Sequence, residues 1–300
     1  MSTPLLEIDR LVLRATEPDG TERDLVHGLS LTVEEGEVLG LVGESGSGKT
    51  LTMLAAIGLL PPSVRIASGD IRLRGESLRE ATDAQLRSLR GRSVSMIFQD
   101  PLTALNPLRR VGTQLASSLR QHRPGLSRRG ARALAVDLFE NVGIRRPAEM
   151  ARAYPHQWSG GMRQRAMIAM AVANDPALLI ADEPTTALDV TVQAQVMRVL
   201  ADARSKTGAG MILITHDLGL SGGVADRIAV MRDGRLLECG DVLDVYDRPA
   251  HPYTRALLAA AEVGRVPRGT ASLTMPPRGA SGPLVEISPG HLVAQGAPIG

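Results

Sequence analysis

The residues best suited to chemistry form one glycine-rich run, Gly43-Glu44-Ser45-Gly46-Ser47-Gly48-Lys49-Thr50. This run fits the pattern G-x-x-x-x-G-K-[ST], whose backbone N–H groups cradle a phosphate chain. Lys49 is expected to reach the β- and γ-phosphates, and the Thr50 hydroxyl is expected to bind Mg²⁺. The alternative is a glycine-rich turn with an incidental lysine, and the flanking residues decide between the two.

The flanks of the run favour the phosphate site. Residues 37–42 have the apolar character of a buried strand, and 51–60 predict a helix that ends before Pro61. The N-terminus of such a helix adds partial positive charge where phosphates bind. Of the 34 basic residues only Lys49 and Lys206 are lysine, so a lysine kept here fits a need for a compact ammonium group.

Paired acids after a second apolar run supply groups that hydrolysis needs. Residues 178–181 predict a buried strand, and Asp182 and Glu183 follow it directly. Asp182 can hold Mg²⁺, and the Glu183 carboxylate can polarise an attacking water. The alternative is a strand followed by a solvated acidic turn.

Three further positions could complete the site, although each signal is weak alone. His216 ends a predicted strand and could bind the γ-phosphate or the water. Gln99 also ends a predicted strand, and its side chain could reach Mg²⁺ and the water. Ser159-Gly160-Gly161 precedes a predicted helix, and these residues could bind a phosphate or only cap that helix.

The elements that must position these residues predict an α/β fold. Strands over 5–13 and 29–33 indicate a small antiparallel sheet, whereas 178–181 and 211–214 are typical of central parallel strands. A helix over 190–203 joins the last two strands, and Asp233-Gly234 predicts a hairpin turn.

The distribution of prolines and glycines along the chain predicts its domains. Proline-punctuated helical patterns over about 100–165 indicate an inserted helical subdomain within a nucleotide-binding domain of residues 1–263. Residues 264–300 are expected to be a Pro- and Gly-rich tail.

The composition excludes several classes of protein. Apolar residues make up 43% and charged residues 22% of the chain, and a net charge of +2 implies no nucleic-acid partner. Cys239 is the only cysteine, so an internal disulfide is excluded. No stretch approaches the length of uninterrupted apolar residues that a bilayer-crossing helix requires.

Together these motifs resemble the ATP-binding subunits of ATP-binding-cassette (ABC) transporters, over roughly residues 5–260. The motifs are similar to Walker A (43–50), the Q-loop (Gln99), the signature motif (Ser159-Gly160-Gly161), Walker B (178–183), the D-loop (Ala187-Leu188-Asp189) and the switch histidine (His216). The resemblance implies a P-loop ATPase core with a mostly parallel sheet, an N-terminal antiparallel β subdomain and an inserted helical subdomain. It further implies that ATP and Mg²⁺ bind, and that Asp189 belongs to the nucleotide site.

Longer segments narrow the resemblance to the dipeptide/oligopeptide/nickel importer subfamily, and within it to the D-type ATPase. They are 96–101, 105–107, 154–157, 161–165, 181–189 and His251-Pro252-Tyr253-Thr254. The resemblance implies uptake of di- or oligopeptides, with nickel or another peptide-like solute as the alternative. It implies a second, F-type ATPase subunit, two membrane permease subunits and an extracytoplasmic solute-binding protein as partners, and a peripheral place on the cytoplasmic face of the membrane.

Two other classes of function are kept open. One is a soluble cassette ATPase acting on ribosomes or DNA, which usually carries two cassettes or a long insertion. The other is a P-loop small-molecule kinase, which would not need Ser159-Gly160-Gly161 or residues 187–189. Co-purification with permease subunits, with ribosomes or DNA, or with neither distinguishes the three classes.

Two departures from the family's pattern bear on function. Trp158 occupies the first signature position, where leucine or a similar residue is usual, and little loss is expected because Ser159 and the glycines contact the phosphate. The tail contains no cysteine, so no iron–sulfur cluster is expected, although residues 289–294 resemble the end of the family's tail.

A third departure generates a prediction about the base. The family places an aromatic residue before the P-loop strand, but the aligned position is near Ala15, and no Phe, Tyr or Trp precedes Phe98. Base stacking on an aromatic ring is worth roughly 1–3 kcal/mol. We therefore expect Ala15→Tyr to bind ATP more tightly than the natural chain does, and titrations with ATP and GTP would measure this. An unchanged ATP affinity would contradict the prediction.

Overall fold

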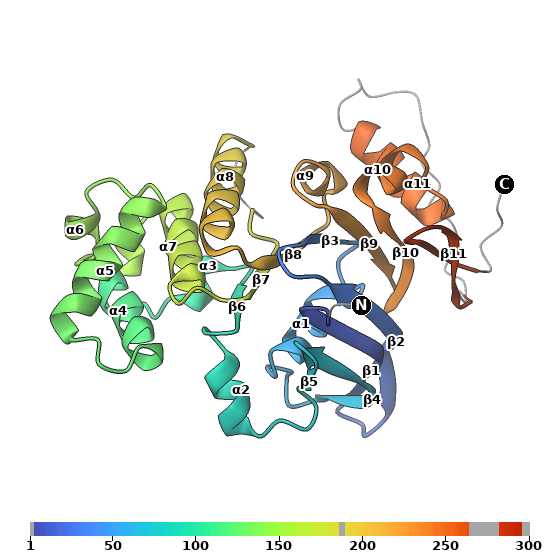
Figure 1. Cartoon of the computed structure of the whole chain (residues 1–300), viewed down its shortest axis with the longest axis horizontal. Helices are drawn as coiled ribbons and strands as arrows, with labels where there is room; N and C mark the ends of the chain where they lie inside the picture. Colours follow the sequence, from blue (N-terminus) through green and yellow to red (C-terminus); the bar gives the residue numbers. More distant parts are fainter. Residues whose placement is uncertain (1–2, 186–189, 264–281, 296–300) are drawn as a thin grey trace. The chain divides into compact units, whose positions relative to one another are not determined.

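The computed structural model describes residues 3–185, 190–263 and 282–295. The chain divides into two compact units. Figure 1 shows the chain with most of its helices and strands labelled. The first unit comprises residues 1–80 and 212–300, and the second comprises 81–211.

An antiparallel sheet opens the first unit, as predicted. It contains β1 (Leu6–Thr16), β2 (Glu22–Val33), β4 (Val64–Leu73) and β5 (Glu76–Ser77), in the order β2-β1-β4-β5. The alternation that identified β1 buries Leu11 and Leu13 while leaving Arg10 exposed. A break in the register between Asp9 and Val12 of β1 lies opposite Gly69 of β4, whose backbone takes a φ of 84°.

A second sheet of the first unit carries the predicted phosphate-loop strand. It contains β3 (Val38–Val42), β8 (Gly210–Thr215), β9 (Arg227–Arg232), β10 (Arg235–Asp241), β12 (His291–Ala294) and β11 (Leu284–Ser288), in the order β11-β12-β10-β9-β3-β8. β3 is parallel to β9, whereas β9, β10, β12 and β11 pair antiparallel. Every residue of β3 and β8 is buried, which explains their continuous apolar runs.

The hairpin predicted at Asp233-Gly234 is confirmed. The backbone φ values are 48° at Asp233 and 73° at Gly234, so both residues are left-handed, as a type I′ turn requires. This turn joins β9 to β10.

The helices of the first unit are α1 (Lys49–Ala56), α9 (Leu218–Gly222), α10 (Val242–Asp247) and α11 (Pro252–Val263). The helix predicted over 51–60 therefore begins at Lys49 and ends at Ala56. It ends early because Gly58 takes a φ of 63° and its N–H bonds back to the carbonyl of Ala55.

Two strands within residues 264–300 were not predicted. β11 and β12 form a hairpin, and β12 pairs with β10 through Glu238↔Val293 and Cys239↔Leu292. Folded chain therefore continues beyond residue 263. The only signal in the sequence was the short alternation over 284–288, which the surrounding prolines and glycines obscured.

The second unit contains two parallel strands and most of the predicted helices. Its strands are β6 (Val94–Ile97) and β7 (Leu178–Asp182), and its helices are α2 (Asp83–Leu89), α3 (Pro101–Ala104), α4 (Val111–His122), α5 (Arg128–Asn141), α6 (Pro147–Met150), α7 (Gly160–Val172) and α8 (Val190–Thr207). Helices α4, α5 and α7 pack against one another (Figure 1). Their core includes an edge-to-face contact between Phe139 and Trp158, with ring centroids 5.4 Å apart. Across the described residues, none of the helices combines the length and the apolar character that spanning a membrane requires.

The register break in the first sheet gives a stability prediction. A Cβ added at Gly69 would lie 2.4 Å from the carbonyl oxygen of Arg10, whereas one added at Gly20, which has the same φ of 84°, would meet no atom within 4 Å. Gly20→Ala should cost about 1–2 kcal/mol from the left-handed backbone alone. Gly69→Ala should cost clearly more, because the backbones of β1 and β4 must separate. Chemical denaturation of both variants measures the difference, and equal losses would contradict the prediction.

Candidate functional site

The phosphate loop lies where the sequence places it, between β3 and α1. Gly46 and Gly48 have φ values of 81° and 96°, conformations that side chains disfavour, so these glycines allow the loop to turn sharply. Helix α1 begins directly after Gly48. Its first turn therefore places backbone N–H groups and partial positive charge at the loop.

The Lys49 ammonium lies within its own loop. Only 4% of the residue is exposed, and Nζ donates to the carbonyl oxygens of Gly43 and Glu44 at 2.8 Å each and to Ser47 Oγ at 3.1 Å. A buried cation needs such partners. The loop oxygens thus hold a positive charge where the pattern predicts a phosphate contact.

The phosphate loop is also fixed to neighbouring elements of the first unit. Gly234 N–H, at the hairpin turn, donates to the Ser47 carbonyl at 3.1 Å, and its own carbonyl accepts from His27 N–H at 2.9 Å. The position of the loop therefore depends on β2 and the β9–β10 turn.

In the second unit, the structure brings together two of the predicted catalytic residues. β6 and β7 are parallel with Ile97 opposite Ala181, so the residues that follow them emerge at one edge. Gln99 Nε2 donates to Glu183 Oε2 at 2.9 Å. Asp182, at the end of β7, is only 3% exposed. The arrangement places an amide beside the carboxylate that could accept a proton from water.

The backbone of Glu183 adds a feature that sequence reasoning missed. Its φ is 43°, in the left-handed region that non-glycine residues rarely adopt. Such strain costs on the order of 1–3 kcal/mol and tends to occur at functional sites. No signal in the sequence marks a glutamate for this conformation.

Ser159 and the glycines after it begin a helix on the surface of the second unit. Ser159 Oγ accepts from Met162 N–H at 3.3 Å, so Ser159 is the N-cap of α7. Ser159 and Gly160 are exposed, whereas Trp158 is 2% exposed and packs on Phe139. The tryptophan at the unusual position therefore anchors the start of the helix and leaves the small residues accessible.

His216 follows β8 in the first unit, as predicted, and its side chain is exposed. The turn that carries His216 is held by Asp217. Its N–H donates to Thr215 Oγ1 at 3.0 Å, and its side chain caps α9. His216 therefore projects from a fixed turn.

Each predicted magnesium ligand carries the kind of donor atom that this ion prefers. The Thr50 hydroxyl, the Asp182 carboxylate and the Gln99 amide all offer oxygen, which Mg²⁺ prefers. In the described ranges, no group of three or more His, Cys, Asp or Glu side chains could hold a metal by itself. In donor chemistry the predicted ligands therefore fit magnesium.

Two other predicted positions are Asp189 and the position of the base, near Ala15. Asp189 lies outside the described residues. Ala15 lies within β1, paired with Arg23 of β2 and Val64 of β4, and is 9% exposed. An aromatic ring introduced at Ala15 would therefore have to extend away from the paired strands to contact a base.

The chain is similar to known proteins over its whole length. The family model described as ABC transporter matches residues 26–186. The dipeptide transport ATP-binding protein DppD of Bacillus subtilis is 46% identical over 265 residues, covering 88% of this chain and 77% of that protein. The oligopeptide transport ATP-binding protein OppD of Mycobacterium tuberculosis is 44% identical over 297 residues, covering 99% of this chain but only 48% of that protein. The chain thus spans about half the length of this mycobacterial relative.

Solved structures are similar in fold. The dimeric structure of a bacterial ABC transporter cassette matches with a TM-score of 0.70 and 26% identity, covering 79% of this chain and 98% of that one. The dimer of a post-hydrolysis state of an ATP-binding cassette, bound to ADP and Pi, matches with the same values. The predicted fold is confirmed.

The Lys49 site gives a prediction that uses the chain's two lysines. In Lys49→Arg, the planar guanidinium cannot donate to three converging loop oxygens as the ammonium does. We expect ATP affinity to fall roughly 10-fold or more, as for the loss of a charge-assisted hydrogen bond. Lys206→Arg is the control, because Lys206 is exposed on α8, and it should bind ATP like the natural chain. Isothermal titration measures both, and equal affinities would refute the role of Lys49.

Proposed function

This chain belongs to the ABC transporter family, and we propose that it is the ATP-binding and ATP-hydrolysing subunit of an importer of di- and oligopeptides. The observation that carries the proposal is the hydrogen bond between Gln99 and Glu183 at the edge shared by β6 and β7. A P-loop alone would suit many nucleotide-binding proteins. An amide held on a carboxylate next to a magnesium-binding aspartate suits one that hydrolyses the γ-phosphate.

The nucleotide-binding residues proposed are Gly43, Glu44, Ser45, Gly46, Ser47, Gly48, Lys49, Thr50, Ser159, Gly160, Gly161 and Asp189. Lys49 would exchange loop oxygens for those of the β- and γ-phosphates, and the α1 N-terminus would stabilise their charge. Thr50, Asp182 and Gln99 would hold Mg²⁺. When bound, this ion supplies charge neutralisation between the β- and γ-phosphates.

Hydrolysis requires a water molecule that loses a proton as it attacks. We propose that Glu183 accepts this proton while the water oxygen bonds to the γ-phosphorus and the bond to the β–γ bridging oxygen breaks. ADP and inorganic phosphate are the products. Gln99 orients the Glu183 carboxylate, and His216 would contact the γ-phosphate or the water.

A second ATPase subunit would complete the nucleotide site. This proposal is supported by the start of α7, where Ser159 and Gly160 are exposed. The preceding residue, Trp158, is buried and holds their backbone in place. These residues would cap the nucleotide bound by the partner, so that closure needs ATP. The dimeric cassettes among the similar structures fit this arrangement. A related F-type chain is the proposed partner.

The remaining partners follow from the names of the relatives. These are dipeptide and oligopeptide transport ATP-binding proteins, so we propose two membrane permease subunits, an extracytoplasmic solute-binding protein and a peripheral position on the cytoplasmic face of the membrane. Nickel or another peptide-like solute is the alternative cargo. A peptide is favoured because these relatives are named as dipeptide and oligopeptide transport proteins.

The Glu183→Gln substitution tests this function. The amide keeps the shape of the side chain but cannot accept the proton, so ATP turnover should fall about 100-fold or more. ATP should still bind and should hold the chain with its partner in a closed dimer, seen by size-exclusion chromatography with and without ATP. Glu149→Gln is the control, because Glu149 forms an exposed ion pair with Arg146 and its loss should change neither measurement.

Two results would overturn this proposal. Undiminished hydrolysis by Glu183→Gln would remove Glu183 as the base. Full activity of a strict monomer, unaffected by substitution of Ser159, would remove the shared site.

A further inference from the structure

We propose that Tyr253 is a positioning residue for the nucleotide site, and that the buried Glu238–His291 pair anchors the turn that carries it. This inference rests on the proposed ATPase function and extends it to the C-terminal part of the chain. All the residues involved belong to the first unit.

The direct contact is made to the phosphate loop. Glu44 N–H donates to the Tyr253 hydroxyl oxygen at 3.3 Å. The carbonyl of the same peptide group, that of Gly43, accepts from Lys49 Nζ at 2.8 Å. One peptide plane is therefore held from both ends, by Tyr253 and by the lysine. Since a peptide group is rigid, a change at its N–H end rotates the oxygen that places the ammonium.

Tyr253 is itself held in place. The residue is fully buried, and the Arg232 guanidinium lies over its ring at 4.7 Å from the centroid. Burial, with the nearby Glu44 carboxylate, raises the pKa of Tyr253 to about 12. The hydroxyl is therefore neutral under ordinary conditions and remains a fixed partner for the loop amide.

The backbone of Tyr253 is fixed by the preceding histidine. Tyr253 N–H donates to His251 Nδ1 at 3.1 Å, at the start of α11. Burial lowers the pKa of His251, which favours the neutral ring that can accept this bond. The segment His251-Pro252-Tyr253 thus acts as a short rigid turn that sets the direction of the tyrosine.

That turn is tied to the sheet by one buried carboxylate. Glu238 on β10 is fully buried and accepts from Ala250 N–H at 2.8 Å and from His251 N–H at 3.0 Å. His291 Nε2, on β12, lies 2.8 Å from Glu238 Oε1. A buried carboxylate needs all such partners, so loss of His291 would disturb the turn.

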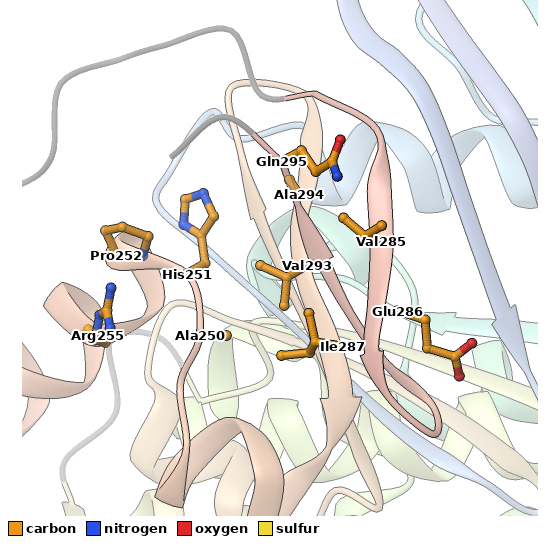
Figure 2. A pocket seen from close by; sticks show the side chains of 10 residues that line it. All are labelled: Ala250, His251, Pro252, Arg255, Val285, Glu286, Ile287, Val293, Ala294 and Gln295. Atoms are coloured by element: carbon orange, nitrogen blue, oxygen red, sulfur yellow. The ribbon is translucent and has the colours of Figure 1, made fainter. Parts of the chain in front are cut away.

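A cavity separates much of the turn from the β11–β12 hairpin. An apolar cavity of about 840 Å³ lies between the turn and the β11–β12 hairpin, and Val285, Ile287 and Val293 line its hairpin side (Figure 2). The side chains in this space leave room between the two elements. Beside this cavity, Glu238 connects the hairpin to the turn, because it contacts His291 of β12 and accepts from Ala250 and His251 N–H.

Tyr253→Phe tests the contact, because it removes only the hydroxyl and keeps the ring beneath Arg232. We expect the Kd for ATP and the KM for ATP to rise about fivefold, the factor that corresponds to one net hydrogen bond. The kcat should change less than twofold, since the lost interaction acts before and during the reaction alike. Tyr246→Phe is the matched control. Its hydroxyl is partly buried and donates to the Leu218 carbonyl rather than to the phosphate loop, so stability should fall similarly without a change in Kd.

The anchor is tested by two substitutions of His291 in the full chain. His291→Leu should raise the Kd for ATP, and His291→Gln, whose amide can still donate to Glu238, should restore it. In the Tyr253→Phe background, His291→Leu should have no additional effect on Kd, because both act through one contact. An independent effect in that background would show that the pair does not act through Tyr253.

The outcomes separate this inference from the proposed function. If the natural chain neither binds nor hydrolyses ATP, the proposed function fails. If it does both, and Tyr253→Phe leaves Kd and KM unchanged, only the role of Tyr253 fails. If His291→Leu does not fold, the Tyr253→Phe measurement still decides the proposal.

Discussion

A buried ammonium group can exist only where oxygen atoms surround it, and this constraint organises the first unit. The Lys49 ammonium meets two backbone carbonyls and one hydroxyl of its own loop. Those oxygens converge only because left-handed glycines shape the loop and because β3, the β9–β10 turn and Tyr253 hold its two ends. The β9–β10 hairpin and α11, which are distant in sequence from the phosphate loop, therefore help to hold the loop in shape.

Much of the fold could be predicted because its signals are local. Continuous apolar runs identified β3, β7 and β8, since strands buried on both faces contain few polar residues. The Asp233-Gly234 pair identified its hairpin, because few other residues adopt two successive positive φ values. The β11–β12 hairpin could not be predicted in this way. Its short strands are only partly buried, and the pairing of β12 with β10 joins residues that are distant in sequence, such as Glu238 and Val293.

The site was predictable in composition but not in geometry. The glycine pattern, the paired acids and the serine before two glycines predicted the candidate residues, and their roles stay predictions. The sequence cannot show that Glu183 is left-handed or that Gln99 contacts it, because neither feature has a local pattern. The roles of Tyr253, Glu238 and His291 depend on three segments meeting in space. For Ser159 the sequence left two roles open, a helix cap or a phosphate contact. In the structure Ser159 caps α7 and is also exposed, so the two roles are compatible.

The packing of Trp158 has a spectroscopic consequence. It is the only tryptophan of the chain, it is almost fully buried against Phe139, and it directly precedes the exposed Ser159. Its indole emission therefore comes from one known place, next to the surface expected to meet another subunit. A change in that emission would follow rearrangement at the start of α7 in solution, without any attached dye.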